Sequence, residues 1–366
     1  MSEWKEYKLG EIATFSYGRL PNKSLLGNGP YTTYSGYKYQ ELYPEYNCNE
    51  GDVILVARGV GGTGDVKLTT QKCYLTNLSI KIDLDNDIVL NKFFYYIYQI
   101  ENLRYLDSGS AQSQITIQDL SNVSIEVPSI FQQKEILSIL SSLDDKIDLL
   151  NRENATLEAM AETLFRQWFI EEAKEDWEEG TISDLIDLNP TRRLAKDTIA
   201  PFLEMSNLST STYAPTYWYD RAFSSGTKFQ NGDTLLARIT PCLENGKTAY
   251  VDFLNEGQIG WGSTEFVVMC SKLGLHSFFS YIIAKYQDFR DYAESCMAGS
   301  SGRQRIDVEN LKNYPISIPD EAIINRFNTN IESFVSKMQI NNKQIRALKA
   351  QRDILLPKLM SNEICF

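Results

Sequence analysis

The chain contains two copies of one ordered series of segments, and this duplication restricts its fold more than any other feature. In each copy, an apolar stretch led by Gly-Asp is followed by an aromatic segment, a Gly-Ser loop, a short stretch ending in proline and a long heptad pattern. Solenoid repeats are only roughly 20 to 50 residues long, so a period of about 181 to 191 residues predicts two whole domains with pseudo-twofold symmetry. The matching pairs are residues 51–58 with 232–238, residues 93–97 with 278–282, residues 115–120 with 306–311, and Pro128 with Pro319.

The length and the cysteine pattern fit two domains in a reducing compartment. A chain of 366 residues is long enough for two domains that each bury a core. The cysteines form no Cys-x-x-Cys pair, which argues against a disulfide framework or a zinc site. The sequence shows neither an apolar signal region nor a membrane-length apolar stretch. We therefore expect a cytoplasmic protein with no membrane contact. The six cysteines are Cys48, Cys73, Cys242, Cys270, Cys296 and Cys365.

The net charge of −12 is unusual for a protein that binds nucleic acid. The distribution of this charge matters more than its sum. Most of the excess negative charge lies in residues 129–179, which end with the acidic stretch 171–179. The two repeats themselves are close to neutral. Local basic faces on the repeats are therefore compatible with the overall charge.

Two heptad patterns predict long helices over residues 129–170 and 319–360. Apolar residues alternate at spacings of four and three from Ile136 to Trp168, and the same alternation recurs from Phe327 to Leu359. Each helix would be roughly 60 Å long. Each seam contains one asparagine, Asn154 in the first helix and Asn341 in the second.

The two asparagines predict how the helices pair. A parallel pairing matched by the repeat would place Asn154 opposite Ile345, whereas an antiparallel pairing places it opposite Asn341. Buried amides favour a partner with which they can form hydrogen bonds, so we predict the antiparallel register. Simple oligomerisation through the heptads is the alternative. The position of one helix between the repeats and the other after them favours an internal spacer between two domains.

A glycine-rich segment raises the alternative of a cofactor site. Residues 59–64 match the pattern G-x-G-x-x-G, which binds a dinucleotide when a helix follows it. The next residues, 65–70, alternate and are rich in β-branched side chains, which predicts a strand and a hairpin tip instead. The lone histidine, His276, lies beside an apolar run and is expected to be structural. With no catalytic triad, Walker loop or amino-methyltransferase motif in the sequence, we do not expect catalysis by this chain.

The Gly-Ser loops, residues 108–114 and 298–305, are the better candidates for a binding site. Gln and Arg can form paired hydrogen bonds with adenine and guanine edges, and Ser and basic groups can hold phosphates. Such residues are also common in ordinary surface loops, which is the alternative for each of them singly. The candidate DNA-binding residues are Arg19, Lys23, Tyr37, Lys38, Arg58, Gln112, Gln114, Arg192, Arg193, Lys196, Arg238, Ser301, Arg303, Gln304 and Arg305.

The strings at the helix ends resemble a known family. Residues 128–136, Pro-Ser-Ile-Phe-Gln-Gln-Lys-Glu-Ile, lead into the first helix, and residues 164–169 and 355–364 close the two helices. Together with the duplication, they resemble the specificity subunit of type I restriction-modification systems. The resemblance covers the whole chain and is strongest in the helices. Residues 319–326 depart from the pattern because they lack the Gln-Lys of the first helix, so the two partner sites are expected to differ in detail.

The resemblance implies an α+β fold with two pseudo-symmetric target-recognition domains joined by two long antiparallel helices, which form a coiled-coil spacer. It implies that each domain recognises half of a bipartite double-stranded DNA site. It also implies two methyltransferase subunits that carry S-adenosylmethionine, a restriction and translocase subunit, and no cofactor or metal on this chain. A self-sufficient nucleotide- or S-adenosylmethionine-binding enzyme and a coiled-coil scaffold without a DNA role are the alternatives. The expected divisions are residues 1–128, 129–170, 171–179, 180–318 and 319–360.

Overall fold

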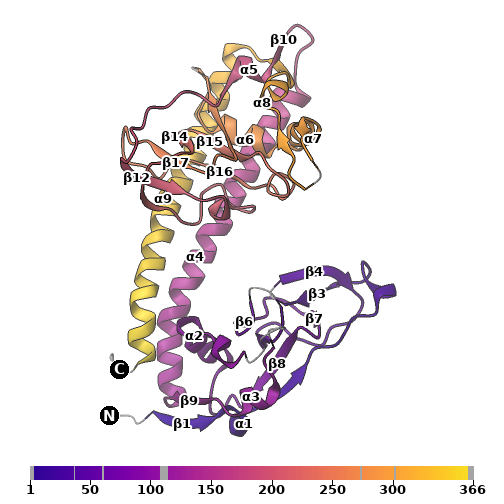
Figure 1. The fold of residues 1–366 in the computed structure, drawn as a ribbon, viewed down its shortest axis with the longest axis vertical. Coiled ribbons are helices and arrows are strands. Elements are labelled where there is room, and N and C mark those ends of the chain that lie inside the picture. Colours follow the sequence, from indigo (N-terminus) through magenta and orange to yellow (C-terminus); the bar gives the residue numbers. More distant parts are fainter. Residues whose placement is uncertain are drawn as a thin grey trace. The chain divides into compact units, whose positions relative to one another are not determined.

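The computed structural model divides the chain into two compact units (Figure 1). One unit comprises residues 1–146 and 348–366, and the other comprises residues 147–347. Each unit holds one repeat together with a part of both long helices, α4 (Ile130–Phe165) and α9 (Glu321–Met360). The structure describes residues 4–36, 38–59, 62–107, 114–272, 274–300 and 302–361.

The first unit is built on two small sheets. The inner strand β5 (Val53–Val56) is buried along its whole length, in keeping with its continuously apolar sequence. The four-stranded sheet has the order β2 (Ala13–Tyr17), β8 (Ser79–Leu84), β5 (Val53–Val56), β6 (Val66–Leu68). The three-stranded sheet has the order β4 (Lys38–Tyr43), β3 (Tyr31–Ser35), β7 (Cys73–Leu75). The remaining elements are β1 (Lys5–Lys8), which pairs with β9 (Ser124–Val127), and α1 (Leu9–Ile12), η1 (Lys23–Leu25), α2 (Asn91–Ile100), η2 (Leu103–Leu106) and α3 (Ile117–Ser121).

The second unit repeats this plan with additions. One sheet has the order β11 (Ile186–Leu188), β18 (Phe266–Ser271), β15 (Thr234–Ala237), β16 (Thr248–Tyr250). The other has the order β13 (Tyr219–Ala222), β12 (Ile199–Leu203), β17 (Gly260–Gly262), β14 (Thr227–Phe229). Two further pairs are β10 (Glu178–Thr181) with β21 (Pro315–Ile318), and β19 (Met297–Ala298) with β20 (Arg305–Ile306). The helices are α5 (Ile182–Leu185), η4 (Met205–Asn207), α6 (Phe279–Lys285), α7 (Gln287–Ser295) and α8 (Val308–Leu311).

The expected duplication and the α+β class are confirmed, because each four-stranded sheet uses the corresponding strands in the same order. The repeated aromatic segment lies in both cores. Phe93 and Phe94 of α2, and Phe278 and Phe279 beside and in α6, are fully buried. Burying one such ring contributes roughly 1.5 to 3 kcal/mol. The aromatic segment therefore fixes the helix against the sheet in each unit.

Backbone hydrogen bonds correct one detail of the repeat. The amide of Ile115 donates to the Ala57 oxygen at 3.0 Å, and the amide of Ile306 donates to the Arg238 oxygen at 2.8 Å. Arg238 therefore corresponds to Ala57, and the expected match of Arg58 with Arg238 is wrong by one residue. The shared arginine was misleading because the strand ladder, rather than residue identity, sets the correspondence.

The same shift makes two loop residues equivalent. Arg58 forms an isolated antiparallel bridge with Gln114 in the first unit, and Ile239 forms the corresponding bridge with Arg305 in the second. Gln114 and Arg305 thus occupy the same place in the two copies. The first copy carries an amide where the second carries a guanidinium group.

The helix segments in the second unit are antiparallel, in the predicted register. Nδ2 of Asn341 donates to Oδ1 of Asn154 at 2.8 Å. Farther along, the rings of Phe169 and Phe327 lie 4.9 Å apart. Residue numbers therefore increase along the first segment while they decrease along its partner, so the two segments run in opposite directions. Oppositely charged side chains support the pairing, with Lys337 Nζ 3.3 Å from Glu153 Oε1.

The helix segments in the first unit pair in the same way. Nη1 of Arg352 lies 3.1 Å from Oδ1 of Asp144, and the two segments contribute Leu140 and Leu356 to one core.

Beyond α4, the helix continues as the π-helical segment η3 (Arg166–Glu171) in the second unit. Strand β10 then begins at Glu178, inside the stretch expected to be a linker, because its backbone pairs with β21.

Candidate nucleic-acid interface

In the first unit, several candidate residues meet at one edge of the four-stranded sheet. Strands β2 and β5 end at this edge and β8 begins there, as their antiparallel registers require. The amide of Arg19 donates to the Leu75 oxygen, and the amide of Arg58 donates to the Leu78 oxygen, each at 3.0 Å. The bridge between Arg58 and Gln114 adds the end of the Gly-Ser loop. We call this edge the first rim, defined as residues 18–19, 57–58, 75–79 and 114.

The side chains of the first rim combine a basic group with an amide. Arg19 is exposed, whereas Arg58 and Gln114 are half-buried. Nε of Arg58 is buried and has no hydrogen-bond partner among the described residues. Two further candidates are exposed outside the rim, Lys23 on η1 and Lys38 at the start of β4. Tyr37 and Gln112 lie outside the described residues.

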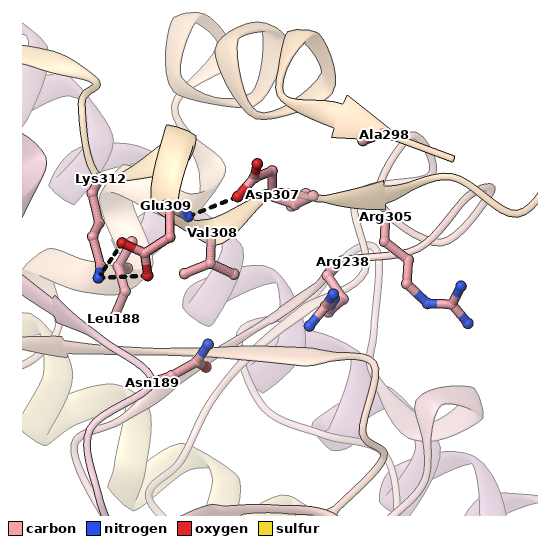
Figure 2. A pocket seen from close by; sticks show the side chains of 10 residues that line it. Leu188, Asn189, Arg238, Ala298, Arg305, Asp307, Val308, Glu309 and Lys312 are labelled. Atoms are coloured by element: carbon pink, nitrogen blue, oxygen red, sulfur yellow. Dashed lines mark hydrogen bonds and ion pairs between the residues drawn. The ribbon is translucent and has the colours of Figure 1, made fainter. Parts of the chain in front are cut away.

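The corresponding edge of the second unit is hollowed. Strand β15 ends and β18 begins at this edge, where the amide of Arg238 donates to the Glu265 oxygen at 3.0 Å. We call it the second rim, defined as residues 191–193, 238–239, 262–265 and 303–305. A hollow of about 660 Å³ lies beside it (Figure 2). Its lining residues are Leu188, Asn189, Arg238, Ala298, Arg305, Ile306, Asp307, Val308, Glu309 and Lys312.

Two arginines of the second rim share one carboxylate. Nη2 of Arg305 lies 2.8 Å from Oε1 of Glu265, and Nε of Arg305 lies 2.9 Å from Oε2. Nε of Arg238 lies 3.9 Å from Oε2 of the same carboxylate. The hydrogen bonds from Arg305 hold the pKa of Glu265 below its usual value. Because two guanidinium groups face one carboxylate, the cluster keeps a net positive charge, and Figure 2 shows both groups at the hollow.

A second hollow, of about 310 Å³, adjoins the first and includes Arg192 in its lining. Nη2 of Arg192 lies 2.8 Å from Oδ1 of Asp233, whose side chain is fully buried. Burial raises the pKa of Asp233, and the arginine opposes that effect. Arg192 is therefore the partner of a buried carboxylate, and its expected contact with DNA stays a prediction. In the first unit Asp52, which follows the corresponding glycine, pairs instead with Lys81 at 3.0 Å.

The hairpin formed by β19 and β20 carries two further candidates of the second repeat, Arg303 and Gln304. Gly302 has a φ of 79°, a conformation that favours glycine in its turn. The amide of Gln304 donates to Oγ1 of Thr240 at 3.2 Å, and the amide of Thr240 donates to the Gln304 oxygen at 3.1 Å. Arg303 is exposed on this anchored hairpin. Arg193 and Lys196 are exposed after β11, and Ser301 lies outside the described residues.

The described residues do not provide the structure that a dinucleotide site needs. Strand β6 follows the glycine-rich segment, as predicted, so the helix of the fingerprint is missing at that place. His276 is structural, as expected: its Nδ1 accepts from the amide of Phe278 at 3.0 Å, and its Nε2 lies 3.0 Å from Glu332. Within the described ranges, no cluster of three or more metal-ligating His, Cys, Asp or Glu side chains occurs. No helix in those ranges is long and apolar enough to span a bilayer.

One known family model matches both repeats. The family model described as "Type I restriction modification DNA specificity domain" matches residues 1–159 and again residues 174–350. The chain belongs to this family.

Individual members of the family match the specificity chain over its whole length. It is 22% identical to the MjaIX specificity subunit of Methanocaldococcus jannaschii, with 99% of this chain and 94% of the relative covered. It is 23% identical to the HindI specificity subunit of Haemophilus influenzae, with 100% of both chains covered. The crystal structure of the S subunit from M. genitalium has a TM-score of 0.60 at 18% identity, covering 98% of this chain and 96% of that one. The fold is therefore that of a specificity subunit.

Sequence reasoning missed two charged residues near the second rim. Glu265 is a single glutamate that precedes an apolar strand, and its role depends on Arg305, forty positions away. Lys228 lines the smaller hollow and lies over the Phe223 ring, with Nζ 4.9 Å from the ring centre. Glu265 matches Leu78 of the first copy, so an alignment of β8 with β18 would have shown a charge gained in the second repeat.

Proposed function

We propose that this specificity subunit recognises a bipartite DNA site, with each rim reading one half. The observation that supports the proposal is that the same sheet edge occurs twice with different polar side chains. Gln114 occupies the place in the first rim that Arg305 occupies in the second. A duplicated scaffold with changed side chains suits the recognition of two different half-sites.

The side chains divide by the contacts their chemistry allows. Lysines and outlying arginines hold phosphates, which gives affinity and fixes position without selecting a sequence. Amides and guanidinium groups at the rims form paired hydrogen bonds with base edges in the major groove. In the first domain the proposed contacts are Arg19, Lys23, Lys38, Arg58 and Gln114, with Tyr37 and Gln112 as further candidates. In the second they are Arg193, Lys196, Arg238, Arg303, Gln304 and Arg305, with Arg192 and Ser301 as further candidates.

The paired helices serve as the spacer and as the assembly surface in this proposal. Two methyltransferase subunits bind the specificity chain, carry S-adenosylmethionine and methylate adenine N6. A restriction and translocase subunit joins them for cleavage. Partner subunits would also supply phosphate contacts, which compensates for the net charge of −12 on this chain. The chain itself is the recognition component and not the catalyst.

Single-molecule methylation mapping tests this proposal. The chain is co-expressed with the methyltransferase subunit of its own system in a host without other adenine methylation, and the genome is sequenced for modified adenines. We expect one motif in two defined parts with a fixed unspecified spacer. The methyltransferase subunit alone is the control and should give no such motif. A single contiguous motif, or methylation that does not depend on this chain, would reject the proposal.

A further inference from the structure

We infer that Arg305, positioned by Glu265, reads a guanine in the half-site of the second domain. This inference rests on the proposed DNA-reading function and adds the identity of one base. The two residues form a paired contact, with Arg305 Nη2 2.8 Å from Oε1 and Arg305 Nε 2.9 Å from Oε2 of Glu265. Their side chains remain accessible, at 44% for Arg305 and 22% for Glu265.

The geometry of the contact leaves one face of the guanidinium group free. A guanidinium group carries five N–H donors in a planar fork, with a side face made by Nε and Nη2 and an end face made by Nη1 and Nη2. Glu265 occupies the side face of Arg305. Among the residues that the structure describes, none accepts a hydrogen bond from Nη1 of Arg305. The free end face offers two parallel donors, and guanine presents two matching acceptors, O6 and N7, in the major groove.

The backbone of Glu265 is anchored on both sides, which fixes the point from which its side chain meets the arginine. Its backbone oxygen accepts from the Arg238 amide at 3.0 Å, and its backbone amide donates to Oγ of Ser263 at 3.1 Å. The paired contact with this carboxylate restricts the rotamers of Arg305 before DNA arrives, which lowers the entropy lost on binding. The guanidinium group of Arg238 keeps the cluster cationic, so the carboxylate does not make this part of the rim repel DNA.

The first domain lacks all three charged groups of this cluster. The amide of Ala57 donates to the Leu78 oxygen at 2.9 Å, as the Arg238 amide does to the Glu265 oxygen, so Leu78 corresponds to Glu265. Ala57, Leu78 and Gln114 therefore stand where Arg238, Glu265 and Arg305 stand in the second domain. The guanine reader is specific to the second half-site.

The test measures methylation by the assembled methyltransferase complex on synthetic duplexes. After mapping has defined the motif, each position of the second half-site is changed in turn to the other three bases. The variants are Arg305→Gln, Arg305→Lys and Glu265→Gln. Arg221→Gln is the matched control, because Arg221 is an exposed arginine of the second unit that lies on β13, outside the second rim. Thermal unfolding of each complex confirms that it is assembled.

The wild-type complex should require guanine at one position, by about 10- to 100-fold in initial rate over the other bases. Both Arg305 variants should lose that preference. Arg305→Lys should lose it although it keeps the positive charge, because an ammonium group cannot contact Glu265 and two base acceptors together. Glu265→Gln should weaken the preference at the same position, while Arg221→Gln should leave it unchanged. The first half-site should be unaffected throughout. If the motif is bipartite but base preference survives in both Arg305 variants, this inference is overturned and the proposed function stands. If mapping finds no bipartite motif, the proposed function fails and the inference falls with it.

Discussion

Asn341 and Asn154 form a buried hydrogen bond between the two long helices, with Nδ2 of Asn341 2.8 Å from Oδ1 of Asn154. Nδ2 of Asn154 in turn donates to Oδ1 of Asn342 at 3.0 Å. Asn154 and Asn341 are buried, and a shift of one heptad would place Asn154 opposite Phe334 or Leu348 instead. A polar pair inside an apolar seam is a device that selects one register at some cost in stability.

We predict that the two asparagines are energetically coupled. Asn341→Leu leaves Oδ1 of Asn154 without its donor and should lower the free energy of unfolding by about 1 to 3 kcal/mol. Asn154→Leu should cost a similar amount, and the double variant should cost less than the sum of the two. Urea denaturation measures all three. Gln344→Leu, an exposed change on the same helix, should have little effect. Simple additivity of the two changes would contradict the coupling.

The register also predicts the outcome of insertions. Seven residues added after Leu150 in α4 alone would move Asn154 away from Asn341, so the insertion should destabilise the helix pair and abolish methylation. Seven residues added before Ile345 in α9 as well should restore the pairing, because the positions of Leu150 and Ile345 match in the antiparallel register. Thermal unfolding and methylation mapping test both steps. The spacer hypothesis requires that a functional double insertion lengthens the unspecified spacer in the motif. An unchanged spacer would count against it.

Glu158 predicts a pH dependence of stability. Its carboxylate accepts from the Tyr281 hydroxyl at 2.9 Å and from the Tyr213 amide at 3.2 Å. Burial raises the pKa of Glu158 from 4.5 to about 7. Between these values the folded protein holds a proton that the unfolded chain has lost, so stability should fall as pH rises from about 4.5 to about 7.

Glu158→Gln should remove this part of the pH dependence. Relative to wild type, the variant should gain on the order of 2 kcal/mol between pH 5 and pH 8, because it has no proton to lose. Urea denaturation across that range measures the difference. Asp148→Asn is an exposed control on the same helix, and its free energy of unfolding should change with pH as that of wild type does. A Glu158→Gln curve parallel to wild type would show that this carboxylate is not the cause.

A contact between α2 and α4 predicts a second stability effect, in the first unit. The Tyr96 hydroxyl donates to Oδ2 of Asp144, and Nη1 of Arg352 lies 3.1 Å from Oδ1. Tyr96 is 2% exposed, so Asp144→Ala leaves a buried hydroxyl without its acceptor and should cost about 1 to 3 kcal/mol. Asp145→Ala, at the exposed neighbouring position, is the control. Equal melting temperatures for the two variants would rule out this role for Asp144.

Local patterns were sufficient to predict the duplication, the two long helices and their register. Heptad periodicity and the need of a buried amide for a partner are properties of short stretches, and Asn154 and Asn341 carried that information. The strand after the glycine-rich segment was predictable for the same reason, because β-branched alternation is local.

The rims were less predictable because they depend on pairing between distant strands. Matching Arg58 with Arg238 because both are arginines was wrong, since the backbone hydrogen bonds show that Ala57 corresponds to Arg238. The ion pair of Arg192 depends on Asp233, which only the folded sheet brings beside it. Glu265 carried no local signal at all. The sequence identifies the polar residues of a candidate loop, but only the fold shows which of them already form ion pairs within the protein.

Replacing the second domain tests the central claim most directly. Residues 180–318 would be exchanged for the corresponding domain of a family member with a different motif, and the hybrid would be expressed with the same methyltransferase subunit for single-molecule methylation mapping. We predict a bipartite motif in which one half is unchanged and the other half is that of the donor. A motif altered in both halves, or unchanged in both, would contradict the account.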